Sequence, residues 1–108
     1  MFSFLKKKYQ TIDIAAFKEL RRTQDIIILD VRSRGEQVGG LINGQRNLNL
    51  KSPDFKEKIS KMDKSKTYVA YCRSGARSAK ACKIMTENGF ISVYNLKGGF
   101  IAWETENN

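Results

Sequence analysis

Continuous hydrophobic runs mark the strands that the sequence predicts. Residues 25–31 (DIIILDV) and 67–71 (TYVAY) form apolar runs that are rich in β-branched and aromatic side chains. Such runs are typical of strands buried on both faces, as in a parallel sheet that helices cover. Three shorter segments also have the character of strands: 9–12 (YQTI), 46–50 (RNLNL) and 92–96 (SVYNL).

Between these runs, apolar residues recur at the spacing of a helix. Ile14, Phe17 and Leu20 lie on one face of a predicted helix, and Asp13 is its expected N-cap. A second stripe of this kind, in a helix that we expect to end at Gly89, consists of Ser78, Ala81, Cys82 and Met85.

Two further helices complete the pattern. Residues 52–62 (SPDFKEKISKM) predict a helix with Ser52 as its cap and Pro53 in its first position. GGFIAWE (98–104) begins a last short helix. Because strands alternate with helices along the whole chain, we expect an α/β protein with a mostly parallel sheet.

The composition excludes several classes of function. The 108 residues suffice for one domain, and 41% of them are hydrophobic, as in ordinary globular proteins. There is no histidine, which excludes nucleophiles activated by histidine and metal sites that need imidazole. The two cysteines lie ten positions apart, a spacing of no zinc or redox motif. We therefore expect no metal and no cofactor.

The net charge of +9 favours anionic small substrates or acidic protein partners. The lysines are dispersed and no aromatic-basic motif appears, so we expect no specific nucleic-acid partner. No apolar run is long enough to span a bilayer, and in MFSFLKKK the charges follow the apolar residues, the reverse of a secretory signal. We expect a cytoplasmic protein with a basic tail (1–8, containing Lys6–Lys8, whose role the sequence does not indicate) and one domain (9–108).

The stretch YCRSGARSAKAC (71–82) carries the candidate chemistry. Cys72 follows a predicted strand and precedes a helix, so it lies at the carboxyl edge of the sheet, where open α/β folds place their sites. The amides after it can form an anion-binding nest, with Gly75 permitting the turn. Arg73 and Arg77 add positive charge, and the helix dipole acts in the same direction. This arrangement favours a reactive thiolate over a structural cysteine.

Other candidate residues have simpler explanations. Cys82 lies on an apolar helical stripe, which indicates core packing rather than a resolving thiol. Asp30 and Arg32 form either a structural ion pair at the end of a strand or a brace for the site. Glu36 is expected to be solvated or to cap a turn, and Trp103 to anchor the last helix.

Three motifs follow one another along the chain: IILDVRSRGEQVGGLINGQRNLNL (27–50), YCRSGARS (71–78) and YNLKGGFIAW (94–103). In this order they resemble the first signature, the active-site loop and the closing signature of the single-domain rhodanese family of thiosulfate sulfurtransferases. The resemblance covers almost all of the chain after the first eight residues. It implies a rhodanese-like three-layer α/β domain, with a five-stranded, mostly parallel sheet and helices on both faces.

The resemblance also implies a reaction. Cys72 would take a sulfane sulfur from thiosulfate or another persulfide donor, hold it as a persulfide, and pass it to cyanide or a thiol acceptor. Arg73 would attract the donor, Arg77 would brace the loop, and Asp30 and Arg32 would support the site, with Asp30 pairing with a loop group such as Arg77. The expected protein is a monomer, and an acidic protein such as a thioredoxin-like carrier is a candidate acceptor. The substrate-binding loop would consist of Arg73, Ser74, Gly75, Ala76, Arg77 and Ser78.

Two other functions stay open on the sequence. Cysteine phosphatases and arsenate reductases also place a thiolate in an arginine-bearing loop after a strand. They have five residues between the cysteine and the arginine, whereas four separate Cys72 from Arg77. A non-catalytic rhodanese-like interaction module is the other alternative, although such modules commonly lose the cysteine that this chain retains.

Overall fold

The computed structural model describes residues 8–106, so only Lys8 of the predicted basic tail is among the described residues. Within that range, no helix has the length and apolar character needed to cross a membrane. The strands are β1 (Gln10–Ile12), β2 (Ile27–Asp30), β3 (Arg46–Asn47), β4 (Thr67–Tyr71) and β5 (Ser92–Leu96). The helices are α1 (Ile14–Thr23), the 3₁₀ helix η2 (Gly35–Gly39), α2 (Phe55–Ser60), α3 (Ala76–Glu87) and α4 (Gly99–Glu106).

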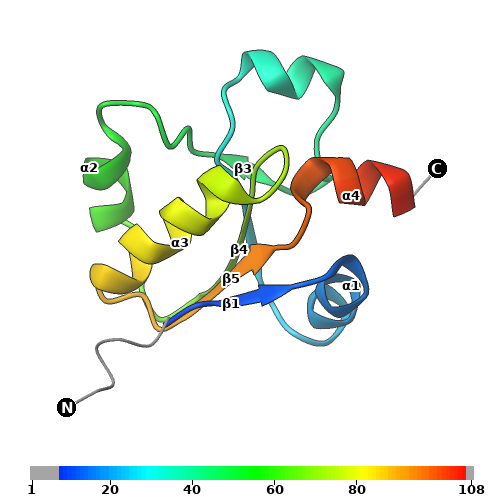
Figure 1. Ribbon diagram of the computed structural model, residues 1–108. Helices are drawn as coiled ribbons and strands as arrows, with labels where there is room; N and C mark the ends of the chain where they lie inside the picture. The colour runs from blue at the N-terminus through cyan, green and yellow to red at the C-terminus, as the bar shows by residue number, and fades with distance from the viewer. Residues whose placement is uncertain (1–7, 107–108) are drawn as a thin grey trace.

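The strands form one parallel sheet, in the order β1-β5-β4-β2-β3, which confirms the predicted fold. The central strand, β4, pairs with β2 and β5 (Figure 1). Asp30 and Tyr71 are register partners, so the carboxyl ends of β2 and β4 lie side by side. Cys72 follows Tyr71 directly and therefore emerges at the carboxyl edge of the sheet.

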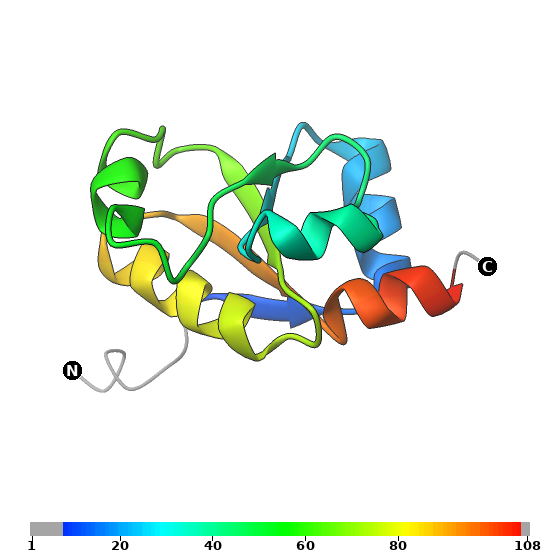
Figure 2. The ribbon, with the colours of Figure 1, turned by 90° about the horizontal axis from the view of Figure 1, so that it is seen from above.

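Helices cover both faces of the sheet, as predicted: α2 and α3 lie on one face, α1 and α4 on the other (Figures 1 and 2). Successive residues of β4 alternate between these layers. Tyr68 and Ala70 pack in the core under α2 and α3, whereas Val69 and Tyr71 pack in the core under α1 and α4. Because both faces are covered, the strand can be apolar throughout.

Helix α1 has the expected start, and helix α3 has the expected end and buried face. Asp13 caps α1, accepting a hydrogen bond from the Ala16 amide at 2.8 Å. α3 ends before Gly89, which has a φ of +92°. All four residues of its predicted stripe are buried: Ser78, Ala81, Cys82 and Met85.

The start of α2 differs from the prediction. The helix begins at Phe55 with Asp54 as its N-cap, not at Ser52 and Pro53. The Ser52 hydroxyl donates a hydrogen bond to the Asp54 carboxylate, and the Ser52 carbonyl accepts one from the Phe55 amide at 3.1 Å. Ser52 thus closes a turn before the helix instead of capping its first amides.

The first turn of α4 packs against the backbone at Cys72. The Phe100 amide donates to the Cys72 carbonyl at 2.8 Å, and the Ile101 amide donates to the Arg73 carbonyl at 3.1 Å. These amides belong to the first turn of a helix, where amides have no partner within the helix itself. Gly99 permits this approach, because a Cβ there would lie 2.5 Å from the Cys72 carbonyl oxygen.

We expect Gly99→Ala to lower the free energy of unfolding by about 2 kcal/mol or more. Gly99 has a φ of +57°, and an added methyl group would collide with the backbone at Cys72 and Arg73. Gly39→Ala is the matched control, since an added Cβ there meets no atom within 4 Å, and it should stay within about 0.5 kcal/mol of the wild type. Urea titrations measure both, and equal losses would contradict this account.

Candidate active site

Cys72 lies in the turn between β4 and α3, with only 1% of the residue exposed. Its sulfur accepts a hydrogen bond from the Gly75 amide at 3.1 Å and lies 3.4 Å from the Ser78 hydroxyl oxygen. Gly75 has a φ of +112°, a left-handed conformation that suits glycine and that turns its amide toward the sulfur. The sequence predicts a nest of amides around the sulfur, and the Gly75 amide is the member of it whose hydrogen bond to the sulfur the structure shows.

The surroundings lower the pKa of the Cys72 thiol below its ordinary value. Burial is the largest influence and acts in the opposite direction, because it penalises the charged thiolate. Hydrogen bonds outweigh it: the Ser78 hydroxyl contributes most, followed by the amides of Ser78, Gly75 and Ser74. The thiolate is the nucleophilic form of cysteine, so the turn favours the reactive state.

Asn95, at the end of β5, completes the polar surroundings of the sulfur. Its side-chain oxygen lies 2.5 Å from the Ser78 hydroxyl, and its side-chain amide donates to the Gly75 carbonyl at 3.3 Å. A hydroxyl has one proton to donate, so at any moment the Ser78 proton can serve only one of three acceptors: the Asn95 side-chain oxygen, the Gly75 carbonyl or the Cys72 sulfur. Asn95 was not among the residues predicted for the site, although a polar amide near the carboxyl end of a predicted strand is a detectable signal.

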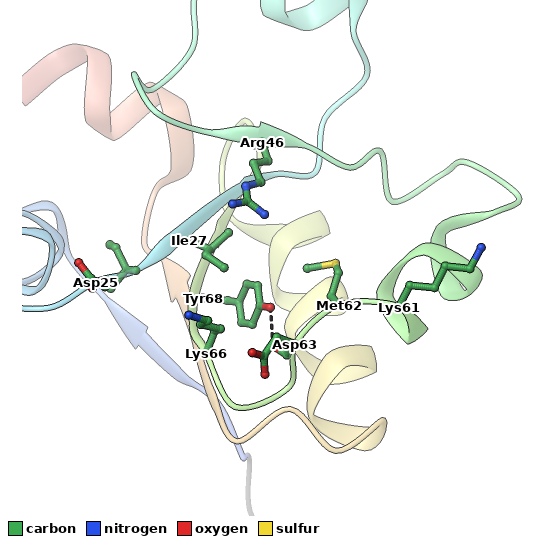
Figure 3. A pocket seen from close by; sticks show the side chains of 9 residues that line it. Asp25, Ile27, Arg46, Lys61, Met62, Asp63, Lys66 and Tyr68 are labelled. Atoms are coloured by element: carbon green, nitrogen blue, oxygen red, sulfur yellow. Dashed lines mark hydrogen bonds between the residues drawn. The ribbon is translucent and has the colours of Figure 1, made fainter.

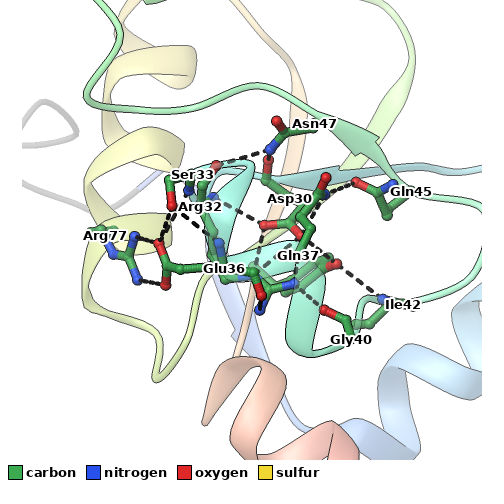
Figure 4. Close-up of polar contacts among 11 residues, drawn as sticks. Asp30, Arg32, Ser33, Glu36, Gln37, Gly40, Ile42, Gln45, Asn47 and Arg77 are labelled. Atoms are coloured by element: carbon green, nitrogen blue, oxygen red, sulfur yellow. Dashed lines mark hydrogen bonds and ion pairs between the residues drawn. The ribbon is translucent and has the colours of Figure 1, made fainter.

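Arg77 pairs with Glu36, not with Asp30 as the sequence led us to expect. Its two terminal nitrogens each lie 2.7 Å from a carboxylate oxygen of Glu36 (Figure 4). Hydrogen bonds from Arg77, and from Ser33, lower the pKa of Glu36 to about 2 although partial burial opposes this. Arg32 already forms an ion pair with the Asp30 carboxylate, which explains why Arg77 pairs with Glu36 instead. Glu36 therefore ties η2 to the first turn of α3.

Asp30 is fully buried and has partners from three directions (Figure 4). It receives hydrogen bonds from Arg32 at 2.8 Å, from the Gln37 amide at 3.0 Å and from the Tyr71 hydroxyl at 2.8 Å. Burial alone would raise the pKa of Asp30, but these bonds hold it below its ordinary value. The Asp30–Arg32 pair thus stabilises the strand end next to Cys72, through Tyr71.

The remaining candidates differ in exposure. Arg73, Ser74 and Ala76 are exposed on the outside of the turn. Cys82 is fully buried, its sulfur lies 3.4 Å from the Tyr94 carbonyl oxygen, and burial raises its pKa to about 12. Cys82 is therefore a core residue, as predicted, and its thiol stays protonated at neutral pH.

A pocket of about 570 Å³ lies away from Cys72, at the amino ends of β2 and β4 (Figure 3). Arg46, Lys61 and Asp63 are among its lining residues, and the Tyr68 hydroxyl donates to the Asp63 carbonyl at 2.5 Å. Its lining combines both signs of charge and holds no thiol. Among residues 8–106, no group of three or more histidine, cysteine or acidic side chains could hold a metal ion.

Comparison with known proteins assigns the fold to a family. The model of the rhodanese-like domain matches residues 13–106. The chain therefore belongs to the rhodanese-like domain family.

Relatives of similar length carry sulfurtransferase names. YtwF of Bacillus subtilis, named as a sulfurtransferase, is 40% identical over 96 residues, which cover 88% of this chain and 90% of YtwF. Thiosulfate sulfurtransferase GlpE of Coxiella burnetii is 33% identical over 96 residues, with 89% and 88% covered. The crystal structure of a rhodanese-related protein from Thermoplasma volcanium has a TM-score of 0.79 at 28% identity, with 91% and 93% covered. These relatives support a rhodanese-type sulfurtransferase at the level of the family.

Removing the Ser78 hydroxyl should raise the pKa of Cys72, because the thiolate loses a hydrogen-bond donor while the burial remains. In Ser78→Ala we expect the acid limb of the alkylation rate with iodoacetamide to move to higher pH. At neutral pH the rate should fall about fivefold, the order expected for one hydrogen bond to a charged group.

Ser74→Ala is the control for this variant, since the described hydrogen bonds to the sulfur include none from the Ser74 hydroxyl. Its pH profile should match that of the wild type. An unchanged profile in Ser78→Ala would show that the hydroxyl does not stabilise the thiolate.

Proposed function

We propose that the protein moves a sulfane sulfur through a persulfide on Cys72. The Cys72 thiolate attacks the outer sulfur of thiosulfate, a sulfur–sulfur bond forms, and the bond inside thiosulfate breaks to release sulfite. An acceptor thiolate or cyanide then attacks the outer sulfur of the persulfide. The products are a new persulfide or thiocyanate, and the Cys72 thiolate is restored. No oxidant or reductant is consumed.

The observation that carries this proposal is the inward direction of the hydrogen-bond donors at Cys72. The Gly75 amide and the Ser78 hydroxyl face the sulfur, and together with neighbouring amides they lower its pKa. A persulfide places negative charge on a sulfur next to the same donors, so they stabilise the intermediate as well as the starting thiolate.

The two arginines have different roles in this proposal. Arg73 is exposed at the mouth of the turn, where its charge attracts an anionic donor. Arg77 is committed to Glu36 by a bidentate ion pair, so it braces the turn against η2. The residues around that mouth are small: Ser74, Gly75 and Ala76. The narrow outer sulfur of the donor enters between them to reach the buried Cys72.

The acceptor in this proposal is a thiol, and cyanide serves as a convenient substitute in assays. In this proposal the protein is a monomer that acts in the cytoplasm, where reducing conditions would keep Cys72 and Cys82 free. The overall positive charge supports an acidic protein, such as a thioredoxin-like carrier, as the thiol acceptor.

The alternatives have less support. A phosphatase turn must hold the three oxygens of a phosphate, and four residues between Cys72 and Arg77 leave less backbone for this than five. A purely non-catalytic module would have no need of donors that lower the pKa of its cysteine.

A thiosulfate-to-cyanide assay tests the proposal. The wild type should form thiocyanate, and Cys72→Ser should form none above the uncatalysed rate. Cys82→Ala is the control: Cys82 lies in the core, so this variant should lose about 1 kcal/mol of stability but keep most of its turnover. p-Nitrophenyl phosphate should not be hydrolysed. Thiocyanate formation by Cys72→Ser, or phosphatase turnover that Cys72→Ser abolishes, would contradict the proposal.

A further inference from the structure

A groove of about 420 Å³ begins at Arg77, the last arginine of the cysteine turn. One side is the segment from Leu50 to Lys56, which leads into α2, and the other side is α3. These two elements lie beside each other on one face of the sheet (Figure 2). Lys80 and Ile84 follow Arg77 along the same face of α3, at the i+3 and i+7 positions. The groove therefore leads away from the proposed reaction centre.

The residues that line the groove include four cations and no carboxylate, and the Asp54 carboxylate of the neighbouring segment is paired with Lys58. Lys51, Lys56 and Lys80 are exposed, and none of them belongs to an ion pair among residues 8–106. The charge of Arg77 is matched by Glu36. Three uncompensated positive charges therefore surround this groove, and they attract a partner that carries several negative charges.

The floor of the groove is apolar, which separates it from a simple anion site. Phe55 is buried beneath it, Ile84 is half-buried, and Pro53 is exposed at its edge. Thiosulfate has no apolar part to place there. An extended polypeptide that alternates an apolar side chain with acidic ones would satisfy both the floor and the surrounding lysines.

We propose that this groove docks an acidic segment of a protein whose nearby thiol accepts the sulfur from Cys72. The inference rests on the proposed function, because it names the partner of that same reaction. Lys80 lies about 4.5 Å along α3 from Arg77, at the rise of an α-helix. An extended chain advances about 3.3 Å per residue, so the span from Arg77 to Lys80 corresponds to about one to two residues of the docked segment, and we place its acidic residues a few positions from the acceptor cysteine.

The transfer step needs no further reactant. The acceptor cysteine attacks as a thiolate, a bond forms between its sulfur and the outer sulfur of the Cys72 persulfide, and the bond to Cys72 breaks. The acceptor leaves as a persulfide, and Cys72 returns to the thiolate that its hydrogen bonds stabilise.

Binding to a synthetic peptide tests the groove independently of sulfur chemistry. The probe is fluorescein-labelled Ser-Gly-Leu-Glu-Glu-amide, in which serine replaces the acceptor cysteine, and the comparison peptide has glutamines in place of the glutamates. Fluorescence anisotropy should show about fivefold tighter binding of the acidic peptide to the wild type, and this preference should decline with added salt. The double variant Lys56→Glu/Lys80→Glu should lose the preference.

Lys61→Glu/Lys66→Glu is the matched control, since it changes the net charge equally but alters the distant pocket at the amino ends of β2 and β4. It should keep the preference. Equal loss in both double variants would show that only overall charge matters, and no preference in the wild type would show that the groove does not recognise acidic segments. Either result overturns the docking proposal.

Turnover with the cysteine forms of the peptides links the groove to the reaction. At saturating thiosulfate, Lys56→Glu/Lys80→Glu should transfer sulfur to the acidic peptide with a lower kcat/KM than the wild type, whereas Lys61→Glu/Lys66→Glu should match the wild type. With cyanide as the acceptor, the wild type and both double variants should react at similar rates. A wild type inactive with cyanide would refute the proposed function, while the anisotropy still decides whether the groove binds the segment. If mercaptosuccinate shows the same dependence on the two lysines, the groove serves a small anionic thiol and the assignment to a protein segment is wrong.

Discussion

The reactive turn depends on where its carbonyl groups point. The carbonyls of Cys72 and Arg73 accept hydrogen bonds from the Phe100 and Ile101 amides in the first turn of α4, so both carbonyls are directed toward α4. Buried carbonyls need donors, and the amides at the start of a helix need acceptors, so one contact satisfies both. The amides of the turn are then left for the sulfur, with Gly75 at 3.1 Å. Without side-chain volume at Gly99, two segments distant in sequence can come this close.

The position of this turn also depends on the hydrogen-bonded cluster around Asp30. The Asp30 carboxylate connects β2 to the end of β4, because it accepts a hydrogen bond from the Tyr71 hydroxyl. The same hydroxyl accepts a hydrogen bond from the Ile42 amide at 3.0 Å. The Arg32 guanidinium lies 4.6 Å from the centre of the Phe100 ring, which joins α4 to the same cluster. Among the described residues no buried side-chain nitrogen or oxygen lacks a partner, as a buried charge cluster requires. The cysteine turn thus lies next to a fully hydrogen-bonded cluster that joins several elements.

The sequence predicts most of the fold, because buried parallel strands and amphipathic helices have local patterns. The start of α2 was misplaced, since the Ser52 hydroxyl bonds to a side chain rather than to a helix amide, and no local pattern distinguishes the two. The pairing of Arg77 was also wrong, because only the three-dimensional structure shows that Arg32 satisfies Asp30 and that η2 brings Glu36 to Arg77. The position of Cys72 followed from the strand that precedes it, but the contacts from α4 and β5 depend on tertiary structure.

The central claim is that the sulfur passes through Cys72, the cysteine whose thiolate the turn stabilises. The most direct measurement is the intact mass of the protein after incubation with thiosulfate, followed by peptide mapping under conditions that preserve persulfides. The account predicts a gain of one sulfur atom, located on the peptide with Cys72 and removed by cyanide. A sulfur located on Cys82, or catalytic turnover without any adduct on Cys72, would contradict it.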